Sequence, residues 1–428
     1  MKIETLQGKA SASVELATRR LNIWEGAVRS SKTTASLIRW MEYARTAPEG
    51  DLFMIGKTER TLTRNVLNPL SATLGRQRFT LNRGEGEGRI FGRRFYLAGA
   101  NDERAADKIA GATAAGIYGD EVGRWPESFF TMALSRLSVT GASLFGTSNP
   151  EGPNHYLLTD YLDRAAVHLT GEGKIERPDG EGLLDLARFS FRLADNPTLS
   201  QAYVDALAAE FTGLWYLRLI EGRWVLAEGA VYDMFDPTGP QVVSELPTIN
   251  RWWVAIDYGT VNPFVALLIG EGVDDRLYVA REWRWDSRAE RKQLTDGQYA
   301  KRLGAWLDKQ AGDLPGAGDP ERVLVDPSAA SFIAQLYEDG WRGVTGADNT
   351  VLDGLRDTAS LLAGSRLKIH ESCVGLIDEM PGYVWDPKAQ KLGEDKPLKE
   401  NDHGPDALRY GVRGTRNVWR RWDLRVAA

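Results

Sequence analysis

The chain has very little cysteine and histidine. Its 428 residues include a single cysteine, Cys373, and four histidines. One cysteine excludes an internal disulfide bond, and one thiol with four scattered imidazoles cannot build an ordinary zinc site. We therefore expect any metal ion in this protein to be held by oxygen ligands.

Long apolar segments are also missing. The sequence contains no run of about 18 apolar residues, and its N-terminus has no charged start followed by an apolar stretch. Both absences predict that the protein neither enters a membrane nor is secreted. We expect it to stay in a cytoplasm.

The chain has no excess of positive charge. Its 53 lysines and arginines are outnumbered by 59 aspartates and glutamates, a formal net charge of −6. This balance excludes a surface that is basic throughout, although local basic patches can still bind a polyanion. The densest basic stretch lies at 76–94, where the pattern predicts a hairpin.

Segment 24–33, Trp-Glu-Gly-Ala-Val-Arg-Ser-Ser-Lys-Thr, has the pattern of a phosphate-binding loop. Backbone N–H groups of such a loop, with the N-terminus of the following helix, point at phosphate oxygens. Lys32 would neutralise charge on the β- and γ-phosphates, and the Thr33 hydroxyl would reach Mg²⁺. Ser31 stands where the usual pattern has its second glycine, so we expect a loop without a positive φ at that position. The segment predicts an ATP site that includes Gly26, Ser30, Ser31, Lys32 and Thr33.

Residues 114–121 predict a short buried strand that ends in two adjacent carboxylates, Asp120 and Glu121. At the end of a strand, Asp120 can hold the Mg²⁺ shell while Glu121 orients or deprotonates the attacking water, as phosphoryl transfer requires. An isolated Asp-Glu pair is more often a solvated turn. Because this pair follows a phosphate-loop pattern at a plausible separation, the two motifs together predict an ATPase.

Apolar strands alternate with helical patterns between residues 20 and 150. This rhythm predicts a mostly parallel α/β sheet, with strands at 21–24, 52–56, 117–119 and 143–145 and helices at 33–45 and 58–74. A Gly/Pro-rich passage follows, and the helical stretch 199–221 is interpreted as a lid or connector. Pro237, Pro240 and Pro247 then break the pattern. We place a domain boundary near residue 240, with a lid or linker region at about 151–240.

Three aspartates are attached to predicted core elements beyond this boundary. Asp257 lies in the apolar strand 251–259, Asp326 ends a strand in the segment 322–328, and Asp406 begins a helix. A buried charge is costly unless it is paired, so the three favour a shared site for two Mg²⁺ or Mn²⁺ ions that cleaves phosphodiesters. Each aspartate taken singly is more often a cap. Weaker candidates for the outer shell of the site are Glu282, Asp402 and His403.

The order of these motifs resembles the large terminase subunit of tailed bacteriophages over nearly the whole chain. The resemblance implies an α/β protein with a P-loop, ASCE-type ATPase domain at 1–240 and an RNase H-like nuclease domain at 241–428. It assigns nucleotide phosphates to the loop 26–33, Mg²⁺ and water activation to Asp120 and Glu121, and nuclease metal binding to Asp257, Asp326 and Asp406. The implied activities are ATP-driven transport of double-stranded DNA into a procapsid and metal-dependent cutting of concatemeric DNA into genome lengths.

The resemblance also suggests how ATP hydrolysis is sensed. Thr147-Ser148-Asn149 resembles the coupling motif, in which Ser148 and Asn149 would sense the γ-phosphate, although the same residues are common in ordinary turns. Arg29 could contact the γ-phosphate within the same subunit. A neighbouring subunit could instead supply an arginine finger, with Arg104 and Arg136 as candidates. Segment 219–225 resembles the linker that precedes terminase nuclease domains.

The implied cofactors are ATP with Mg²⁺ for the ATPase, and Mg²⁺ or Mn²⁺ for the nuclease. The implied partners are double-stranded DNA, the portal protein, the small terminase subunit and further copies of the chain in a ring on the procapsid, in the host cytoplasm. The isolated protein could be monomeric.

Two other classes of function stay open. A helicase-like ATPase should show a second ATPase-like lobe, which 240–428 does not offer, and a DDE recombinase fused to a P-loop domain would more usually end its triad in glutamate. The second class is a non-catalytic scaffold that binds the portal, because Ser31 departs from the loop pattern and the aspartates could merely cap strand or helix ends.

Overall fold

The computed structural model describes residues 6–101, 109–211, 213–259 and 262–426. The chain forms two compact units. The first comprises Met1–Ala208, Leu214–Leu226 and Lys391–Glu394, and the second comprises Ala209–Gly213, Ala227–Gln390 and Asp395–Ala428. Along the chain the main change between units falls after Leu226, upstream of the position near 240 where we placed a boundary. No helix in the described residues is long and apolar enough to cross a membrane.

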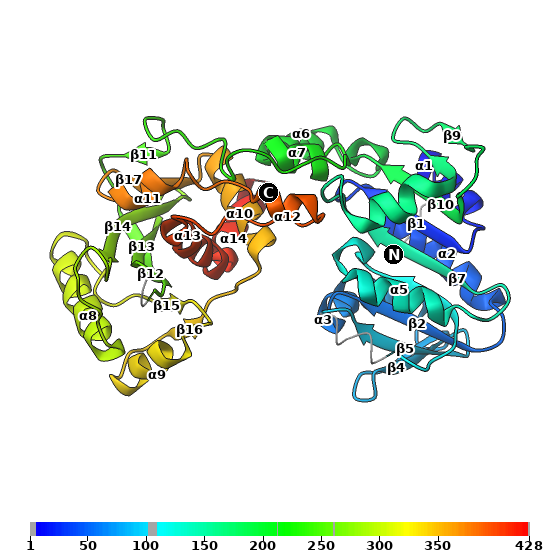
Figure 1. Ribbon diagram of the computed structural model, residues 1–428, viewed down its shortest axis with the longest axis horizontal. Helices are drawn as coiled ribbons and strands as arrows, with labels where there is room; N and C mark the ends of the chain where they lie inside the picture. Colours follow the sequence, from blue (N-terminus) through cyan, green and yellow to red (C-terminus); the bar gives the residue numbers. More distant parts are fainter. Residues whose placement is uncertain (1–5, 102–108, 212, 260–261, 427–428) are drawn as a thin grey trace. The chain divides into compact units, whose positions relative to one another are not determined.

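The first unit is built on a sheet in which ten strands are described (Figure 1). Their order is β3-β4-β5-β2-β6-β7-β1-β10-β8-β9, and all neighbours from β5 to β8 are parallel. The bounds are β1 (Leu21–Gly26), β2 (Asp51–Gly56), β3 (Phe79–Asn82), β4 (Glu87–Ile90), β5 (Arg93–Gly99), β6 (Ala114–Gly119), β7 (Ser143–Ser148), β8 (Ala165–Leu169), β9 (Ile175–Glu176) and β10 (Leu184–Phe191). This mostly parallel α/β sheet confirms the predicted fold class, and β3 and β4 form the predicted hairpin.

Two apolar cores cover the two faces of this sheet. Successive side chains of a strand point to opposite faces, so Trp24 joins one core with Trp40 of α2, while Ile23 joins the other core with Phe129 of α5. Burial on both faces explains why these strands are almost continuous apolar runs in the sequence. The helices and helical turns before residue 200 are α1 (Gly8–Leu16), α2 (Lys32–Thr46), α3 (Glu59–Leu62), η1 (Thr63–Leu67), α4 (Asn68–Leu74), η3 (Val122–Arg124), α5 (Glu127–Arg136), η4 (Leu157–Tyr161), η5 (Leu162–Arg164) and η6 (Leu193–Asp195).

The region 151–240 is more than the lid or linker that the sequence predicted. Strand β10 pairs in parallel with β1, and β8 pairs with β10, so these two strands belong to the central sheet. Residues 199–221 do form the expected helical stretch, as α6 (Gln201–Glu210) and α7 (Gly213–Leu219). Sequence reasoning missed β8 and β10 because the surrounding glycines and prolines are typical of loops. The pairing of these strands with the sheet depends on contacts between residues far apart in the chain.

The second unit is built on a sheet of seven described strands in the order β11-β17-β14-β13-β12-β15-β16. Strands β12, β13 and β14 form an antiparallel meander, and β15 and β17 pair in parallel with β12 and β14. The bounds are β11 (Val242–Val243), β12 (Ile249–Asp257), β13 (Phe264–Gly272), β14 (Leu277–Trp285), β15 (Arg322–Val325), β16 (Val344–Gly346) and β17 (Leu367–His370). The sequence predicted β12 to β15 at nearly these positions.

Helix α13 packs directly on β12, β13 and β15. Its Gly411 and Gly414 permit this close approach, because a Cβ there would lie 2.1 Å from Ile269 Cδ1 and 2.2 Å from Leu324 Cδ1. The contact places the N-terminal turn of α13, which includes Asp406, near the end of β12. The helices of this part of the chain are α8 (Asp296–Asp313), α9 (Ala330–Glu338), α10 (Val351–Ala363), α11 (Val374–Glu379), α12 (Pro387–Lys391), α13 (His403–Gly414) and α14 (Arg416–Val426).

Candidate active sites

The loop between β1 and α2 has a backbone that only a few residue types tolerate. Gly26 has a φ of 128°, and a Cβ there would lie 2.0 Å from the carbonyl oxygen of Phe191, so glycine is required. Ser31 also has a positive φ, 72°, which corrects the expectation from the sequence. The chain has to turn into α2 at this residue, and serine adopts the left-handed conformation at a steric cost of about 1–2 kcal/mol.

The side chain of Lys32 is buried inside this loop. Its Nζ donates to the carbonyl oxygen of Ala27 at 2.7 Å, and the Ser30 hydroxyl donates to the same oxygen at 2.7 Å. Burial lowers the pKa of Lys32 to about 8, although the negative charges of Glu121, Asp120 and Glu25 act in the opposite direction. Thr33 follows in the first turn of α2. The loop therefore presents a cation and a helix N-terminus together, the combination that binds phosphate.

Asp120 and Glu121 follow β6 at the same edge of the sheet as the loop, because β6, β7 and β1 are neighbouring parallel strands. Burial raises the pKa of Asp120 to about 6, and the charge of Glu121 adds to this effect. The carboxylate of Asp120 accepts hydrogen bonds from Asn65 Nδ2 at 3.3 Å and from the Thr147 hydroxyl at 3.2 Å. The Thr147 hydroxyl oxygen in turn accepts from the backbone N–H of Glu121 at 3.2 Å.

The residues predicted to sense the γ-phosphate lie at the end of β7, on this edge of the sheet. The Ser148 hydroxyl donates to the carbonyl oxygen of Asn149 at 2.9 Å. The buried Asn149 Oδ1 accepts no hydrogen bond from any described residue. Thr147, which the sequence placed in this motif without a role, is the residue that contacts both Asp120 and Glu121.

The candidate arginines have different surroundings. The exposed guanidinium of Arg29 lies over the ring of Tyr203, 5.8 Å from its centroid. Arg136 ends α5 and contacts the hydroxyl of Ser135. Arg104 lies outside the described residues. Sequence reasoning did not consider Arg124, which forms an ion pair with Glu121 at 3.7 Å.

Segment 219–225 is bonded to the phosphate-binding loop. The Val28 N–H donates to the carbonyl oxygen of Leu219 at 2.9 Å, and Trp224 Nε1 donates to Glu25 Oε2 at 3.1 Å. Glu25 is buried just before Gly26 and is also paired with Arg188 at 3.0 Å. These bonds tie the segment to both the start and the middle of the loop.

We expect Gly222→Ala to destabilise the first unit by about 1–3 kcal/mol, because overpacking displaces well-packed atoms. A Cβ at residue 222 would lie 2.5 Å from Phe191 O and 3.0 Å from the loop nitrogen of Ala27. Gly182→Ala is the matched control, since its φ of 83° resembles the 70° of Gly222 but a Cβ there meets no atom within 4 Å. Denaturant unfolding would compare the two variants. Equal losses of stability would show that contact with the loop is unimportant.

The three predicted aspartates of the second unit are brought to neighbouring positions. Asp257 ends β12, and Asp326 directly follows the adjacent parallel strand β15, with its N–H donating to Ile256 O at 3.0 Å. Asp406 lies in the first turn of α13. Burial raises the pKa of Asp257 to about 6; a hydrogen bond with His403 opposes the rise, while the charges of Asp406 and Asp326 add to it.

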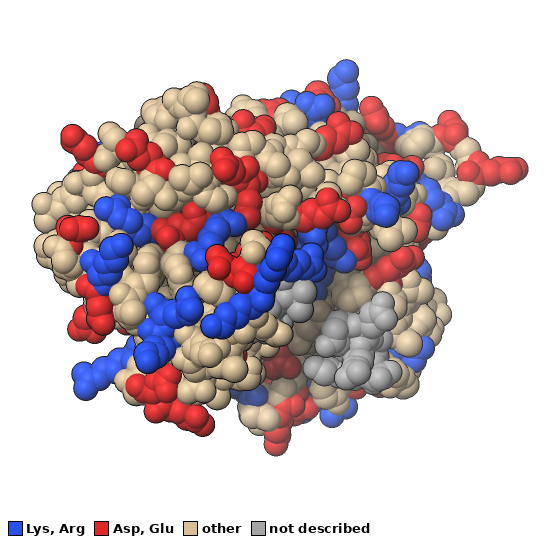
Figure 2. All heavy atoms as spheres, turned by 60° about the vertical axis from the view of Figure 1, so that its left-hand side comes forward, with Lys and Arg blue, Asp and Glu red and all other residues tan. Residues whose placement is uncertain are grey.

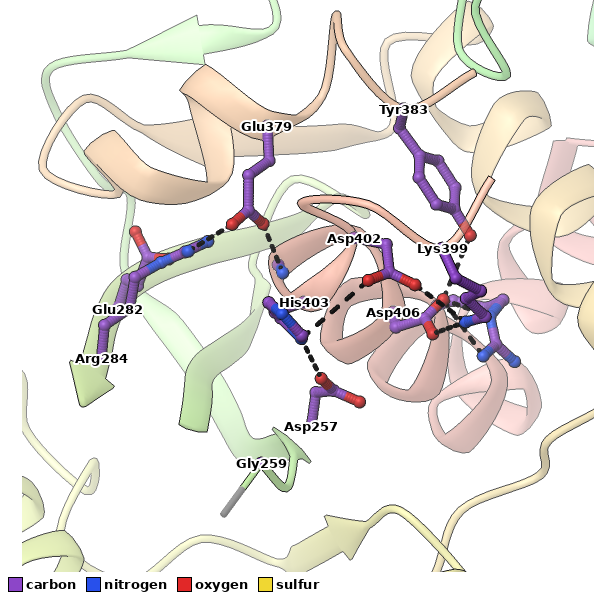
Figure 3. Close-up of polar contacts among 12 residues, drawn as sticks. Asp257, Gly259, Glu282, Arg284, Glu379, Tyr383, Lys399, Asp402, His403 and Asp406 are labelled. Atoms are coloured by element: carbon purple, nitrogen blue, oxygen red, sulfur yellow. Dashed lines mark hydrogen bonds and ion pairs between the residues drawn. The ribbon is translucent and has the colours of Figure 1, made fainter. Parts of the chain in front are cut away.

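Positively charged and hydrogen-bonding groups surround Asp406 (Figure 3). Lys399 Nζ lies 2.6 Å from Asp406 Oδ2 and 2.9 Å from Asp402 Oδ2. The Tyr383 hydroxyl donates to Asp406 Oδ1 at 3.1 Å, and Arg409 lies 3.2 Å from the same oxygen. Desolvation lowers the pKa of Lys399, but Asp406 and Asp402 outweigh it and the pKa is raised. Sequence reasoning missed Lys399 because it lies in a loop without periodicity.

The side chains that surround Asp257 include His403, whose Nδ1 lies 3.0 Å from Asp257 Oδ2. Desolvation lowers the pKa of this imidazole, but the bond to Asp257 outweighs it and the pKa is raised. No group of three His, Cys, Asp or Glu side chains in the described residues already has a metal-binding arrangement. The candidate ligands nevertheless fit a divalent ion held by oxygen, because all three are carboxylates. In the structure the ammonium of Lys399 balances part of their negative charge.

Comparison with known proteins gives a consistent result. Residues 27–238 match the family described as "Terminase large subunit, T4likevirus-type, N-terminal". The chain is similar to the solved large terminase of a thermophilic bacteriophage in complex with ADP, at 35% identity, with 95% of this chain and 98% of that chain covered and a TM-score of 0.83. A second crystal form of that protein gives 35% identity, 96% and 99% coverage and a TM-score of 0.84. Its complex with ATP-γ-S gives 35% identity, 95% and 98% coverage and a TM-score of 0.82. No curated protein matches the chain.

Proposed function

Because the chain belongs to the large terminase subunit family of bacteriophages, we propose that it hydrolyses ATP to drive double-stranded DNA into a procapsid and cuts concatemeric DNA into genome lengths. One observation supports this proposal above the others: loop 26–33, Asp120 and Glu121 converge on one edge of the first sheet. The relative from the thermophilic bacteriophage was solved with ADP and with ATP-γ-S.

In the proposed ATPase centre, the backbone of loop 26–33 and Lys32 bind the β- and γ-phosphates. Thr33 and Asp120 would hold the Mg²⁺ ion that accompanies ATP. Glu121 would orient or deprotonate the attacking water, and its backbone N–H donates to the Thr147 hydroxyl.

Other residues would sense the γ-phosphate. Ser148 and Asn149 do so from the end of β7, and Arg29 contacts it within the same subunit. An arginine finger from a neighbouring subunit, Arg104 or Arg136, is the alternative to Arg29.

In the proposed nuclease centre, Asp257, Asp326 and Asp406 would hold Mg²⁺ or Mn²⁺. When bound, such ions activate water and stabilise the leaving oxygen of a phosphodiester. Lys399 keeps the carboxylates of Asp406 and Asp402 together, and His403 holds Asp257 in place. Both contacts limit the motion of the carboxylates before an ion arrives.

The proposed partners are double-stranded DNA, the portal protein, the small terminase subunit and further copies of the chain in a ring, all in the host cytoplasm. DNA would be bound mainly through its phosphates, because packaging must accept any sequence. Figure 2 shows lysines and arginines interspersed with acidic side chains on the face that it presents, so local groups of basic residues rather than a uniform surface would bind the DNA. We assign ATP chemistry to residues 1–240 and nuclease chemistry to 241–428.

Removal of divalent metal tests the proposed nuclease. We expect the purified protein to cut plasmid DNA with little sequence preference in Mg²⁺ or Mn²⁺. Cutting should stop in excess EDTA and resume when the metal is restored in excess, because the carboxylates alone cannot activate water. Gel electrophoresis of the plasmid measures this. Cutting that persists in EDTA would contradict the proposal. Strand-transfer products would favour a recombinase, and absence of both cutting and ATP turnover would favour a scaffold.

A further inference from the structure

A buried cluster of two glutamates and one arginine lies beside the first turn of α13 (Figure 3). Glu282 and Arg284 are on β14, two residues apart and therefore on the same face of the strand. Glu379 ends α11. Arg284 forms ion pairs with both glutamates, through Nε to Glu282 and through Nη1 to Glu379. The side chains of Glu282 and Glu379 are only 5% and 12% exposed.

The second oxygen of each glutamate accepts a hydrogen bond from the start of a helix. Glu379 Oε2 accepts from the N–H of Gly404 at 2.7 Å, in the first turn of α13. Glu282 Oε2 accepts from the N–H of Leu376 at 3.1 Å, in the first turn of α11. The first N–H groups of a helix have no partner within it, and a negative charge there is favourable. In the described structure neither helix receives a side-chain bond from its own N-cap residue, Asp402 or Cys373.

Two glycines leave room for the guanidinium of Arg284. A Cβ at Gly375 would lie 2.2 Å from Arg284 Nε, and a Cβ at Gly404 would lie 2.7 Å from Arg284 Nη2. Neither glycine has a positive φ, so close approach rather than backbone conformation accounts for them. The starts of α11 and α13 are thus both packed against one planar group.

We propose that Glu282, Arg284 and Glu379 are positioning residues of the nuclease centre, which fix the first turn of α13 so that His403 and Asp406 are in place before a divalent ion binds. This inference rests on the proposed nuclease function. The first turn of α13 contains both His403, bonded to Asp257, and Asp406. A carboxylate that is already in position loses less conformational freedom when a metal binds.

Stability alone explains the cluster less well. Buried ion pairs often add little stability compared with apolar side chains of similar volume, because desolvation offsets their attraction. This cluster also leaves two carboxylates for one guanidinium. Its hydrogen bonds instead fix the positions of two helix N-termini, and one of these, the start of α13, lies beside the proposed metal centre.

The test is Arg284→Lys in the full-length protein. Lysine keeps the positive charge but lacks the planar fork that contacts both glutamates. We expect the dissociation constant for Mg²⁺, measured by titration calorimetry, to rise by about 10–100-fold. The amide of Gly404 should exchange with solvent faster in metal-free protein. For plasmid cleavage, kcat should fall while the KM for DNA stays unchanged.

The matched control is Arg276→Lys, which changes an arginine just before β14 whose Nη1 pairs with Asp274 at 2.6 Å and whose Nε donates to the carbonyl oxygen of Ser365 at 3.2 Å. It should leave Mg²⁺ affinity and Gly404 exchange unchanged. Glu379→Gln is the second variant should Arg284→Lys fail to fold; it keeps an acceptor for the Gly404 N–H but loses the ion pair, and Mg²⁺ affinity should again fall. Unchanged Mg²⁺ affinity and exchange in a folded variant, even with a lower melting temperature, would overturn the inference. Absence of metal-dependent cutting in the wild type would instead overturn the proposed nuclease.

Discussion

Asp257→Asn is expected to lower metal-dependent DNA cleavage by about 10²–10³-fold while ATP turnover stays at the wild-type rate. Metal-ion stabilisation of developing charge is worth several kcal/mol, and each 1.4 kcal/mol is a factor of ten in rate. Asparagine has the shape of aspartate but no charge, so the proposed ion would lose one of its three carboxylates. Plasmid cleavage and phosphate release from ATP, measured on the same preparation, check both halves of the expectation.

The fold of the Asp257→Asn variant should be intact. Burial raises the pKa of Asp257 from 3.8 to about 6, so at neutral pH the charged carboxylate costs more free energy in the folded protein than in the unfolded chain. A neutral amide removes that cost, so the melting temperature should be unchanged or higher. Asp339→Asn, at an exposed aspartate after α9, is the control and should cut at the wild-type rate. Wild-type cutting by Asp257→Asn would show that the metal centre lies elsewhere.

The sequence predicted a mostly parallel first sheet and the strands that carry the candidate ATPase residues, but not the order of those strands. Parallel strands bring their carboxyl ends to one edge, so apolar runs that end at Gly26, before Asp120 and at Ser148 had to converge once they were neighbours. In the structure β6, β7 and β1 are such neighbours. In the second unit the structure likewise places Asp257 beside Asp326, at the ends of the neighbouring parallel strands β12 and β15.

Features that depend on distant contacts were not predictable from local pattern. Strand β10 lies beside β1, although more than 150 residues separate them in the sequence. Lys399 reaches Asp406 from a loop with no periodicity, and Glu379 reaches Gly404 from another helix. The expectation that Ser31 would not have a positive φ was wrong for a different reason. Glycine is preferred at positive φ, but the rest of the fold can offset the steric cost of another residue there.

Replacing Glu121 by glutamine is expected to lower ATP turnover by about 10²–10⁴-fold, the usual contribution of a positioned general base. Glutamine can still orient water but cannot accept its proton at neutral pH. Asp120 is a poorer candidate for this role because it is buried and its carboxylate already accepts hydrogen bonds from Asn65 and Thr147. Glu121 has a φ of 53°, and its partly exposed side chain is held 3.7 Å from Arg124. Release of phosphate from ATP under single-turnover conditions measures the loss.

Binding and hydrolysis should separate in the Glu121→Gln variant. The loop, Lys32 and Thr33 are untouched, so its affinity for ATP-γ-S should stay within about twofold of the wild type, or even rise because one negative charge beside the phosphates is removed. Glu127→Gln, at an exposed glutamate in the first turn of α5, controls for the loss of a nearby charge and should turn over ATP normally. Plasmid cutting without ATP should be unchanged, since the proposed nuclease residues lie in the second unit. Normal ATP turnover by Glu121→Gln would assign the base to another residue, whereas loss of nucleotide binding would mean that Glu121 shapes the loop rather than activating water.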